Sequence, residues 1–563
     1  MRSSCHRGVA AVALAAISLT AAGSTAALGG QPASGEQPAP GGTVVVAGDQ
    51  LLGTFNPYSF ELASAWTYWV MQLVWPQASN FQPDGTVEWN LELLADEPTL
   101  EVDPQRVTYR INDAAEWSDG TPITADDFVF TWEASNGALG PEVDPETGEN
   151  LPLYDSGSTA GYEDQTCAAA DELTVVCEYT TPYADWPNLF GPVLPRHAFA
   201  AAGGGDTVAG FNDGFVYGLT DPAAIPSGNW FSVAEVNGEE TLRLVRNEQY
   251  WGEPALLDEI VIRWITDPTQ LPAALENGEV DVIFPSAQID TVEQTRSIAG
   301  TTTIVDFGTF YEHLDFNVDN VHLATREVRQ AIGLALDRQQ IVDRLVGPVS
   351  PDAEVMNHHF FYPGGAAYEP NGAARYGERD VEAARALLES AGYIEGAGGV
   401  YEHPADGRLS LRITWREPNP RREQTAQLVQ ASLAEAGIAV ETAPAPDFAF
   451  LGEGNFDIAL FGYTNFTVPS IYTNIYGTDG EGNVGRYSNP EVDTLFAEAD
   501  QELDSAVRAG LLDRIDEILW EDLPVIPLFQ VPEVLAFDSA VLNVEHNGYQ
   551  GFTTNANEWA VSG

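Results

Sequence analysis

The sequence predicts an α/β fold built from at least two domains or lobes. At 563 residues, the chain is too long for one hydrophobic core of ordinary size. Hydrophobic residues make up 44% of the chain and aromatic residues 10%, which suits globular packing and argues against general disorder. In the middle of the chain, strand patterns alternate with helix patterns, an order typical of an α/β domain.

The first part of the chain opens with a strand pattern and a helix pattern. Residues 43–48, TVVVAG, form a short apolar run that predicts a buried strand. Apolar residues at helical spacing predict a helix over residues 61–74. The segment RVTYRIN, residues 106–112, alternates apolar and polar residues and predicts a strand with one buried face.

The later part of the chain repeats the order of strand, helix and strand. An apolar stripe over residues 328–345 predicts one helix, which ends at the Gly-Pro pair 347–348. Asp380 and Asn489 stand at the N-cap positions of two further predicted helices. Strands are expected at 240–251, 257–265, 409–415, 438–444, 456–463 and 524–531, and helices at 268–278, 381–391, 422–437 and 489–504.

Residues 116–132, EWSDGTPITADDFVFTW, place acidic residues beside aromatic ones and raise the question of a catalytic or metal site. Thr124 is a candidate N-cap, and Asp127 stands three residues later, in capping-box position. Asp126 lies in the first helical turn, where the helix dipole favours negative charge. Because each acid has a local structural role and no histidine lies nearby, we expect this segment to be scaffold.

The charge of the chain is extreme, with 84 acidic residues against 24 basic ones and a net charge of -60. All 24 basic residues are arginine, so a Walker A loop and Schiff-base catalysis, which need lysine, are excluded. Nucleic acid is not expected as a partner, because this charge repels phosphates. The acids are spread along the chain and favour adaptation to high salt, where the Debye length falls to about 3 Å.

Residues 1–28 predict a signal peptide, and residues 29–42 predict a flexible linker. Arg2 and Arg7 come before an apolar run of about 15 residues, which is too short to span a bilayer. The linker is rich in proline, glycine and serine. No later stretch is apolar enough to cross a membrane, so we expect an exported, soluble protein in the periplasm or outside the cell.

Two cysteines remain once Cys5 leaves with the signal. Cys167 and Cys177 lie ten residues apart, across an Ala-Asp-Glu turn and before the strand-like segment LTVVCEY. In an exported protein, this arrangement predicts a disulfide that closes a hairpin. Two cysteines alone would make a poor metal site.

Several segments, in order, resemble the solute-binding proteins of the peptide/nickel class of ABC importers, extracellular family 5. The hallmark is LADEPTLEVDPQRVTYRINDAAEWSDGTPITADDFVFTW, residues 94–132. The segments that follow it in family order are PSGNWFSVAE, LRLVRNEQYWGEPALLDEIVIR, ALENGEVDVI, VRQAIGLALDRQQIV, AARALLESAGY, YSNPEVDTLFAEA and EDLPVIPLF. The resemblance covers most of residues 42–563.

This resemblance implies a two-lobed clamshell of the periplasmic-binding-protein type II class, with an extra subdomain in the first lobe. We expect lobe I over residues 43–305, with the inserted subdomain at about 60–182. Lobe II is expected over residues 306–522, and residues 523–563 are expected to return to lobe I. A solute held between the lobes would shift an open-closed equilibrium by contacting both of them.

The function implied by the resemblance is delivery of a ligand, expected to be an oligopeptide, to the membrane permease subunits of an ABC importer. No catalysis, cofactor or metal is expected, and the protein is expected to act as a monomer. Many relatives carry a lipid on a cysteine after a Leu-Thr-Ala-like triplet. Here Ala22 stands at that position, so no lipid anchor is expected there.

Ligand contacts are carried over only where this sequence matches the family. Where peptide binders have an aspartate for the ligand's α-amine, this chain has Asn465, whose amide oxygen is still able to accept a hydrogen bond. Glu61 and Asp315 match acidic contacts of the two lobes, although each also fits a solvated surface acid. The tryptophans fit core packing as well as the cleft. The expected ligand-binding residues are Glu61, Trp66, Asp315, Tyr463, Asn465 and Phe466.

Two other functions stay open at this point. The same fold would also suit a non-peptide solute, such as an oligosaccharide or a nickel chelate. A secreted hydrolase is the more remote alternative, because the segment around Ser156 lacks the Gly-x-Ser-x-Gly motif and a nearby histidine. His358 and His359 are adjacent and make a poor metal pair, and residues 479–483 lack the glutamate that completes a calcium loop.

Overall fold

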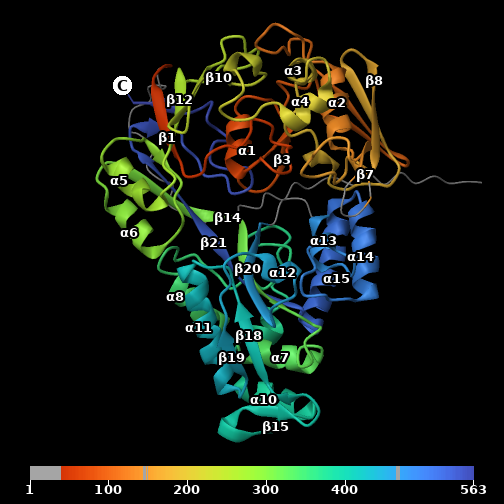
Figure 1. Ribbon diagram of the computed structural model, residues 1–563, viewed down its shortest axis with the longest axis vertical. Helices are drawn as coiled ribbons and strands as arrows, with labels where there is room; N and C mark the ends of the chain where they lie inside the picture. Colours follow the sequence, from red (N-terminus) through yellow and green to blue (C-terminus); the bar gives the residue numbers. More distant parts are fainter. Residues whose placement is uncertain (1–39, 144–147, 149, 465–469, 563) are drawn as a thin grey trace, which may run out of the picture. The chain divides into compact units, whose positions relative to one another are not determined.

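A computed structural model describes residues 40–143, 148, 150–464 and 470–562 of the chain (Figure 1). Its central feature is a ten-stranded mixed sheet with the order β10-β11-β12-β1-β13-β21-β14-β20-β18-β19. These strands are β1 (Thr43–Gly48), β10 (Phe231–Asn237), β11 (Thr241–Arg246), β12 (Glu259–Trp264), β13 (Val282–Ile283), β14 (Thr301–Phe316), β18 (Ser410–Thr414), β19 (Ala439–Thr442), β20 (Ile458–Thr464) and β21 (Val525–Asp538).

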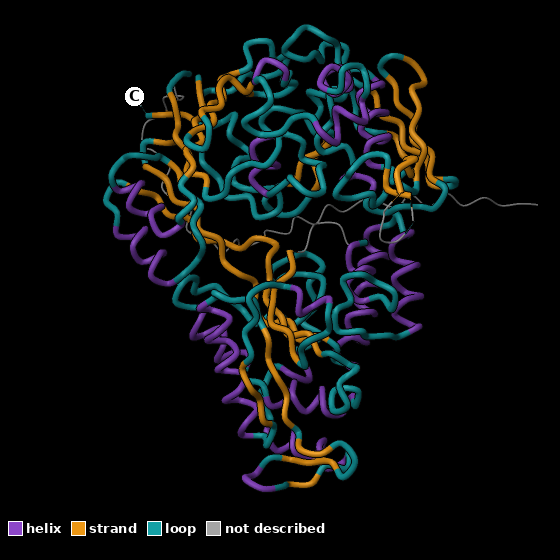
Figure 2. The backbone as a smooth tube through the Cα atoms, viewed as in Figure 1, coloured by secondary structure: helices purple, strands orange, loops and turns teal. Residues whose placement is uncertain are grey.

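Two long strands, β14 and β21, link the two halves of this sheet (Figure 2, orange). They pair antiparallel from Thr301 opposite Asp538 to Asp315 opposite Val525, with register shifts between Phe307 and Tyr311 and at Glu312/His313. On one side, β1 is parallel to β12 and β13. On the other side, β18 is parallel to β19 and β20. The chain therefore builds two α/β units around a shared pair of strands.

Separate hydrophobic cores define the two lobes of this α/β clamshell. The first core contains buried side chains from Val44 to Trp264 and from the C-terminal segment, including Trp559. We call the part of the chain packed around it the first lobe. The second core runs from Leu314 to Val531, and a third, smaller core joins α13, α14 and α15. We call the part packed around these two cores the second lobe.

The C-terminal segment begins to pack in the first core at a later residue than the sequence suggested. Side chains from Leu523 to Val531 still pack in the second core, although a return was expected from residue 523. Leu535 and Phe537 are the first side chains of β21 that join the first core. The physical reason is that β21 is long enough to pass through both lobes.

The first lobe carries an additional four-stranded sheet of order β4-β5-β9-β8, against which α2 (Ala125–Ser135) packs. Its strands are β4 (Thr99–Val102), β5 (Gln105–Arg110), β8 (Gln165–Asp171) and β9 (Thr174–Tyr179). Cys167 and Cys177 face each other in the β8–β9 hairpin and form a disulfide. The predicted hairpin disulfide is therefore confirmed.

The expected helix over residues 61–74 is shorter in the structure. Helix α1 spans Ala65–Met71, and Ser64 caps it by accepting a hydrogen bond from Thr67. Leu62 lies before the helix and is exposed. Apolar periodicity alone overestimated the length of the helix, because the helix begins only after the N-cap serine.

The second lobe contains the predicted β-α-β unit, in which α11 (Pro420–Glu435) connects the parallel strands β18 and β19. The stripe expected to form one helix over residues 328–345 forms two instead, α7 (Arg326–Ala335) and α8 (Arg338–Leu345). Asp337 breaks the stripe, because its side chain accepts a hydrogen bond from Gln340 N and caps α8.

Other helices of the second lobe begin where the sequence predicted. Asp380 caps α10 (Val381–Ser390), and Asn489 caps α14 (Pro490–Gln501). The remaining elements are α3 (Arg196–Ala202), α4 (Thr207–Asp213), α5 (Leu271–Glu276), α6 (Ile289–Ser297), α9 (Ala373–Tyr376), α12 (Ala449–Gly452), α13 (Ile471–Tyr476), α15 (Ser505–Asp522), β2 (Ser79–Phe81), β3 (Val87–Trp89), β6 (Leu139–Val143), β7 (Asn150–Pro152), β15 (Ile394–Glu395), β16 (Tyr401–His403), β17 (Gly407–Arg408), β22 (Val541–Leu542) and β23 (Ala560–Val561). Across the described ranges, every helix is too short or too polar to cross a bilayer.

The acidic segment 116–132 contains the capping box that the sequence predicted. Thr124 and Asp127 form the capping box at the start of α2. Asp127 is buried and also accepts hydrogen bonds from Arg196 N (3.0 Å) and Trp117 Nε1 (3.4 Å). The expectation that no histidine lies nearby was wrong, because the fold brings His197 Nε2 within 2.9 Å of Asp119 Oδ2. This histidine is 78 residues away in the sequence, so local inspection missed it.

Candidate ligand-binding cleft

A cavity of about 430 Å³ lies where elements of the two lobes meet. Its volume falls within the range of about 300–1,000 Å³ usual for ligand pockets. The loop after β1, helix α1 and the loop after β13 contribute from the first lobe, and the start of α11 contributes from the second. The lining residues are Asp49, Gln50, Ala65, Trp66, Trp69, Phe284, Pro285, Ser286, Ala287, Gln288, Phe310, Asn419, Arg421, Val531, Pro532 and Glu533.

Aromatic side chains form one wall of this cavity. Trp66 and Trp69 are three residues apart on α1, and their rings meet edge to face at 5.2 Å between centroids. Trp69 also meets Phe284 edge to face at 5.5 Å. Phe310, on β14, lines the cavity from the strand pair that joins the lobes. These rings offer a ligand a rigid apolar surface.

Two carboxylates line the cavity, and each has a positioning partner. Asp49 directly follows β1 and accepts a hydrogen bond of 2.6 Å from Trp66 Nε1. Glu533, on β21, lies 2.7 Å from His546 Nε2 through its Oε2 atom. A side chain at Gly308 would collide with Glu533, so the glycine allows this close approach. Both acids are thus held in defined orientations with capacity for further hydrogen bonds.

Arg421 is the one basic residue among the described residues that line the cavity. It stands in the first turn of α11, which Asn419 caps. Its Nη2 atom donates to Glu312 Oε1 at 3.2 Å, and Arg422 Nε donates to both carboxylate oxygens of the same glutamate. Burial disfavours the charged form of Glu312, but the ion pairs with Arg422 and Arg421 prevail and lower its pKa below the usual value. Among the described residues, the buried Arg421 Nε has no hydrogen-bond partner.

Of the four expected ligand residues that the structure describes, one lines this cavity. Trp66 lines it, together with Trp69. Glu61 is exposed and is not among the lining residues. Asn465 and Phe466 lie outside the described residues.

Asp315 and Tyr463 lie in one network around His313, and neither is among the residues that line the cavity. Asp315 is 3% exposed, and its Oδ1 atom lies 2.7 Å from His313 Nδ1. Tyr463 stacks on His313 at 4.6 Å and donates to Gly482 O at 2.9 Å. Burial raises the pKa of the Tyr463 hydroxyl, which therefore stays protonated. Their roles as ligand contacts remain predictions.

The sequence reasoning missed Asp49, Arg421 and Glu533. Two local signals were available: Asp49 directly follows an apolar strand, and Arg421 lies in the first turn of a helix capped by Asn419. In α/β sheets, ligands bind beyond the carboxyl ends of the strands, which marks the segments after β1 and β13. Glu533 gave no local signal, because it lies within a long strand.

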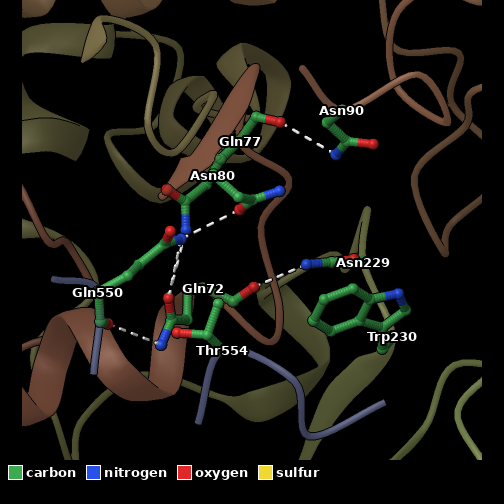
Figure 3. A pocket seen from close by; sticks show the side chains of 8 residues that line it. All are labelled: Gln72, Gln77, Asn80, Asn90, Asn229, Trp230, Gln550 and Thr554. Atoms are coloured by element: carbon green, nitrogen blue, oxygen red, sulfur yellow. Dashed lines mark hydrogen bonds between the residues drawn. The ribbon is translucent and has the colours of Figure 1, made fainter. Parts of the chain in front are cut away.

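A second, smaller cavity of about 40 Å³ lies within the first lobe (Figure 3). Amide side chains dominate its lining, and Gln550 donates to Asn80 Oδ1 at 3.0 Å and to Gln72 Oε1 at 3.3 Å. Asn229 Oδ1 has no partner among the described residues. This volume suits one or a few waters, which would satisfy that oxygen. It is too small for a solute of the size that the larger cavity accepts.

Comparisons with known proteins agree with this geometry. The model of the bacterial extracellular solute-binding proteins, family 5 Middle, matches residues 91–484. The oligopeptide-binding protein OppA of Mycobacterium tuberculosis is 28% identical over 525 residues, which cover 90% of this chain and 83% of OppA.

Solved structures share the fold across nearly the whole chain. The periplasmic EDTA-binding protein EppA matches with a TM-score of 0.85 at 28% identity, covering 94% of this chain and 98% of EppA. The oligopeptide-binding protein AppA of Bacillus subtilis, solved in complex with a nonapeptide, matches with a TM-score of 0.71 at 20% identity, covering 94% and 100%. The chain belongs to the bacterial extracellular solute-binding proteins of family 5, the family that its sequence motifs predicted.

Proposed function

We propose that this protein binds a short oligopeptide with free termini in the cavity between its lobes and delivers it to the permease subunits of an ABC importer. The observation that carries this proposal is the combination of both signs of charge with an aromatic wall. Arg421 faces the ligand space from the second lobe, while Asp49 and Glu533 line it with carboxylates. A zwitterionic peptide matches such a lining.

The ammonium group of the peptide is assigned to Asp49 or Glu533. These acids replace the carboxylate that peptide-binding relatives of this family place where this chain has Asn465. A charge-assisted hydrogen bond to a carboxylate contributes about 1.5–3 kcal/mol, against about 0.5–1.5 kcal/mol for a neutral one. The peptide carboxylate would pair with the guanidinium group of Arg421, and side chains would rest on Trp66, Trp69 and Phe284.

Relatives with other ligands suggest a second candidate ligand, a metal chelate. EppA, which is 28% identical to this chain, is described as an EDTA-binding protein. A metal chelate of that kind is anionic and would need an excess of positive charge around it. The cavity offers one arginine against two carboxylates, in a chain of net charge -60, so the electrostatics favour the peptide.

The cellular setting is part of the same proposal. The signal-like residues 1–28 and the acidic composition support export of a monomer into a salt-rich surrounding, without a lipid at Ala22. Residues 43–305 and 306–522 would move as the two halves of the clamshell. The shifts in strand register between β14 and β21, next to Phe310, support a hinge at the cavity.

The test is isothermal titration calorimetry with a set of matched ligands. Tri- to pentapeptides with free termini are compared with the same peptides after N-acetylation or C-amidation, with maltotriose and with Fe(III)-EDTA. We expect binding of the free peptides and at least about tenfold weaker binding after N-acetylation, equivalent to about 1.4 kcal/mol. Binding of maltotriose or Fe(III)-EDTA but of no peptide would contradict the proposal.

Two variants test whether Glu533, rather than Asp49, holds the ammonium group. Glu533→Gln keeps the shape of the side chain and removes its charge, so the difference between free and N-acetylated peptide should shrink. Glu61→Gln is the matched comparison, because Glu61 is exposed and lies outside the cavity lining. An effect of Glu61→Gln alone would instead support the contact carried over from the family. Hydrolysis of any peptide by the wild type, absent from the cavity variant Glu533→Gln, would contradict binding without chemistry.

A further inference from the structure

We propose that Asp185 and Arg508 form a latch that holds the two lobes together through segments outside the hinge strands β14 and β21. Asp185 belongs to the first lobe: it stands at the N-cap position of the short 3-10 turn Trp186–Asn188, and its neighbours Tyr183 and Trp186 are buried in the first core. Arg508 belongs to the second lobe, because it lies on α15, whose Leu512 and Ile515 pack in the third core.

The pair has the geometry of a strong ionic contact. Both terminal nitrogens of Arg508 donate to the two oxygens of Asp185, with 2.9 Å between Nη2 and Oδ2. The side chains are 9% and 4% exposed, so the pair is nearly dry. Asp185 Oδ2 also accepts a hydrogen bond of 3.0 Å from Ser470 N. A bidentate, buried arginine-carboxylate pair fixes distance as well as orientation.

Other contacts from the same two segments surround the ion pair. Ala184 N donates to Asp500 O at 3.0 Å. The hydroxyls of Tyr183 and Ser470 lie 3.2 Å apart. Leu503, in the connection between α14 and α15, packs against the first core. Residues 183–185 therefore contact residues 470 and 500–508 in one compact patch that combines charge, backbone and apolar contacts.

This patch is independent of the covalent connection between the lobes. Strands β14 and β21 connect them through the sheet, whereas the patch uses segments outside those strands. Movement about the hinge strands would have to separate Asp185 from Arg508. When the lobes separate, water can solvate both charges, so opening leaves neither of them buried and unpaired. The contact thus favours closure while still permitting release.

Replacing Asp185 or Arg508 should change the open-closed equilibrium more than the stability of either lobe. In the closed state, a single replacement leaves the other charge buried without its partner, whereas in the open state that charge is hydrated. The balance therefore moves toward the open state. The latch sets how often the empty cleft is closed, and this fraction affects both ligand affinity and the surface presented to a transporter.

The experiment is single-molecule FRET on the ligand-free protein, so that its result does not depend on which solute binds. Dyes are attached to Glu239→Cys and Ala386→Cys, which replace exposed residues of the first and second lobe. We compare the wild type with Asp185→Asn and Arg508→Gln. We expect the ratio of closed to open molecules to fall at least tenfold in each variant. Near-UV circular dichroism confirms that each variant is folded.

Arg514→Met is the matched control. Arg514 lies on the same helix as Arg508, but it pairs with Glu491 and Glu517 of the second lobe and is exposed. It should leave the ratio unchanged. Folded Asp185→Asn and Arg508→Gln variants with the wild-type ratio would overturn the latch, as would an equal loss in the control. If a single variant does not fold, the double variant Asp185→Asn/Arg508→Gln, which leaves no charge unpaired, decides in its place: a ratio equal to that of the wild type overturns the proposal.

Discussion

Two buried carboxylate-arginine contacts in this protein use the same chemistry for different purposes. Glu312 pairs with Arg422 and Arg421 inside the second lobe, where β14 meets the start of α11. Asp185 pairs with Arg508 between elements of different lobes. Separating Glu312 from its partners requires the lobe to unfold, whereas separating Asp185 from Arg508 requires only that the lobes move apart. The location of a pair, rather than its strength, decides whether it supports stability or conformation.

The largest effect should come from breaking the pair inside the lobe. Glu312→Gln leaves two arginines without their carboxylate at a position that is 1% exposed. We expect the free energy of unfolding to fall by about 3–5 kcal/mol. Urea denaturation measures this change, because urea does not alter ionic strength. A loss as small as that of an exposed ion pair would show that water or a rearranged partner replaces Glu312.

A second effect tests the surroundings of the interlobe pair through pH. Burial is the main cause that raises the pKa of Asp500 to about 6, from an ordinary value of 3.8, and Asp185 and Asp164 act in the same direction. Arg508 and the hydrogen bond from Thr473 oppose the shift. Because the folded-state pKa is raised, the stabilisation from protonating Asp500 is complete below about pH 4 and is lost as the pH rises through about 6.

The corresponding variant is Asp500→Asn, which keeps an acceptor for the Thr473 hydroxyl. Relative to the wild type, we expect it to gain at most about 3 kcal/mol of stability at pH 7 and nothing at pH 4. Thermal unfolding at several pH values measures the difference and cancels the titration of the many other acids. A difference that does not change between pH 4 and pH 7 would mean that Asp500 titrates normally in the folded protein.

A smaller effect separates scaffold acids from cleft acids. Asp127→Ala removes the capping box of α2 and leaves the N–H groups of Thr124 and Arg196 without their acceptor. We expect a loss of about 1–2 kcal/mol in unfolding free energy, with unchanged peptide affinity. Asp126→Ala is the control, since Asp126 is exposed in the same helical turn. Weakened peptide binding would place segment 116–132 at the ligand site.

The smallest effect is expected from an exposed ion pair. Arg514 contacts Glu491 at 3.1 Å and Glu517 at 2.9 Å, and its side chain is about half exposed. Solvated pairs of this kind contribute little, because water and salt screen them. Arg514→Met should therefore leave the urea midpoint unchanged at high salt. A clear shift of that midpoint would mean that exposed ion pairs contribute measurably to the stability of this acidic protein.

Local signals in the sequence were sufficient for much of the fold. The strands, the caps at Asp380 and Asn489 and the hairpin disulfide each depend on residues close together in the chain, so pattern and spacing predicted them. The helix over residues 328–345 was misjudged, because Asp337 caps a new helix within a continuous apolar stripe. The candidate site was predicted less well: among the expected residues that the structure describes, Trp66 is the one that lines the cavity.

By itself, the sequence determined the α/β class, the family, the capping box in segment 116–132 and the exclusion of lysine chemistry. Those properties follow from composition, periodicity and motifs of neighbouring residues. Tertiary structure alone decided that Glu533 and Arg421 line one cavity and that Asp185 meets Arg508 across 323 residues of sequence. Such contacts depend on how two lobes pack around shared strands, and no local pattern encodes the partner of a residue that far away.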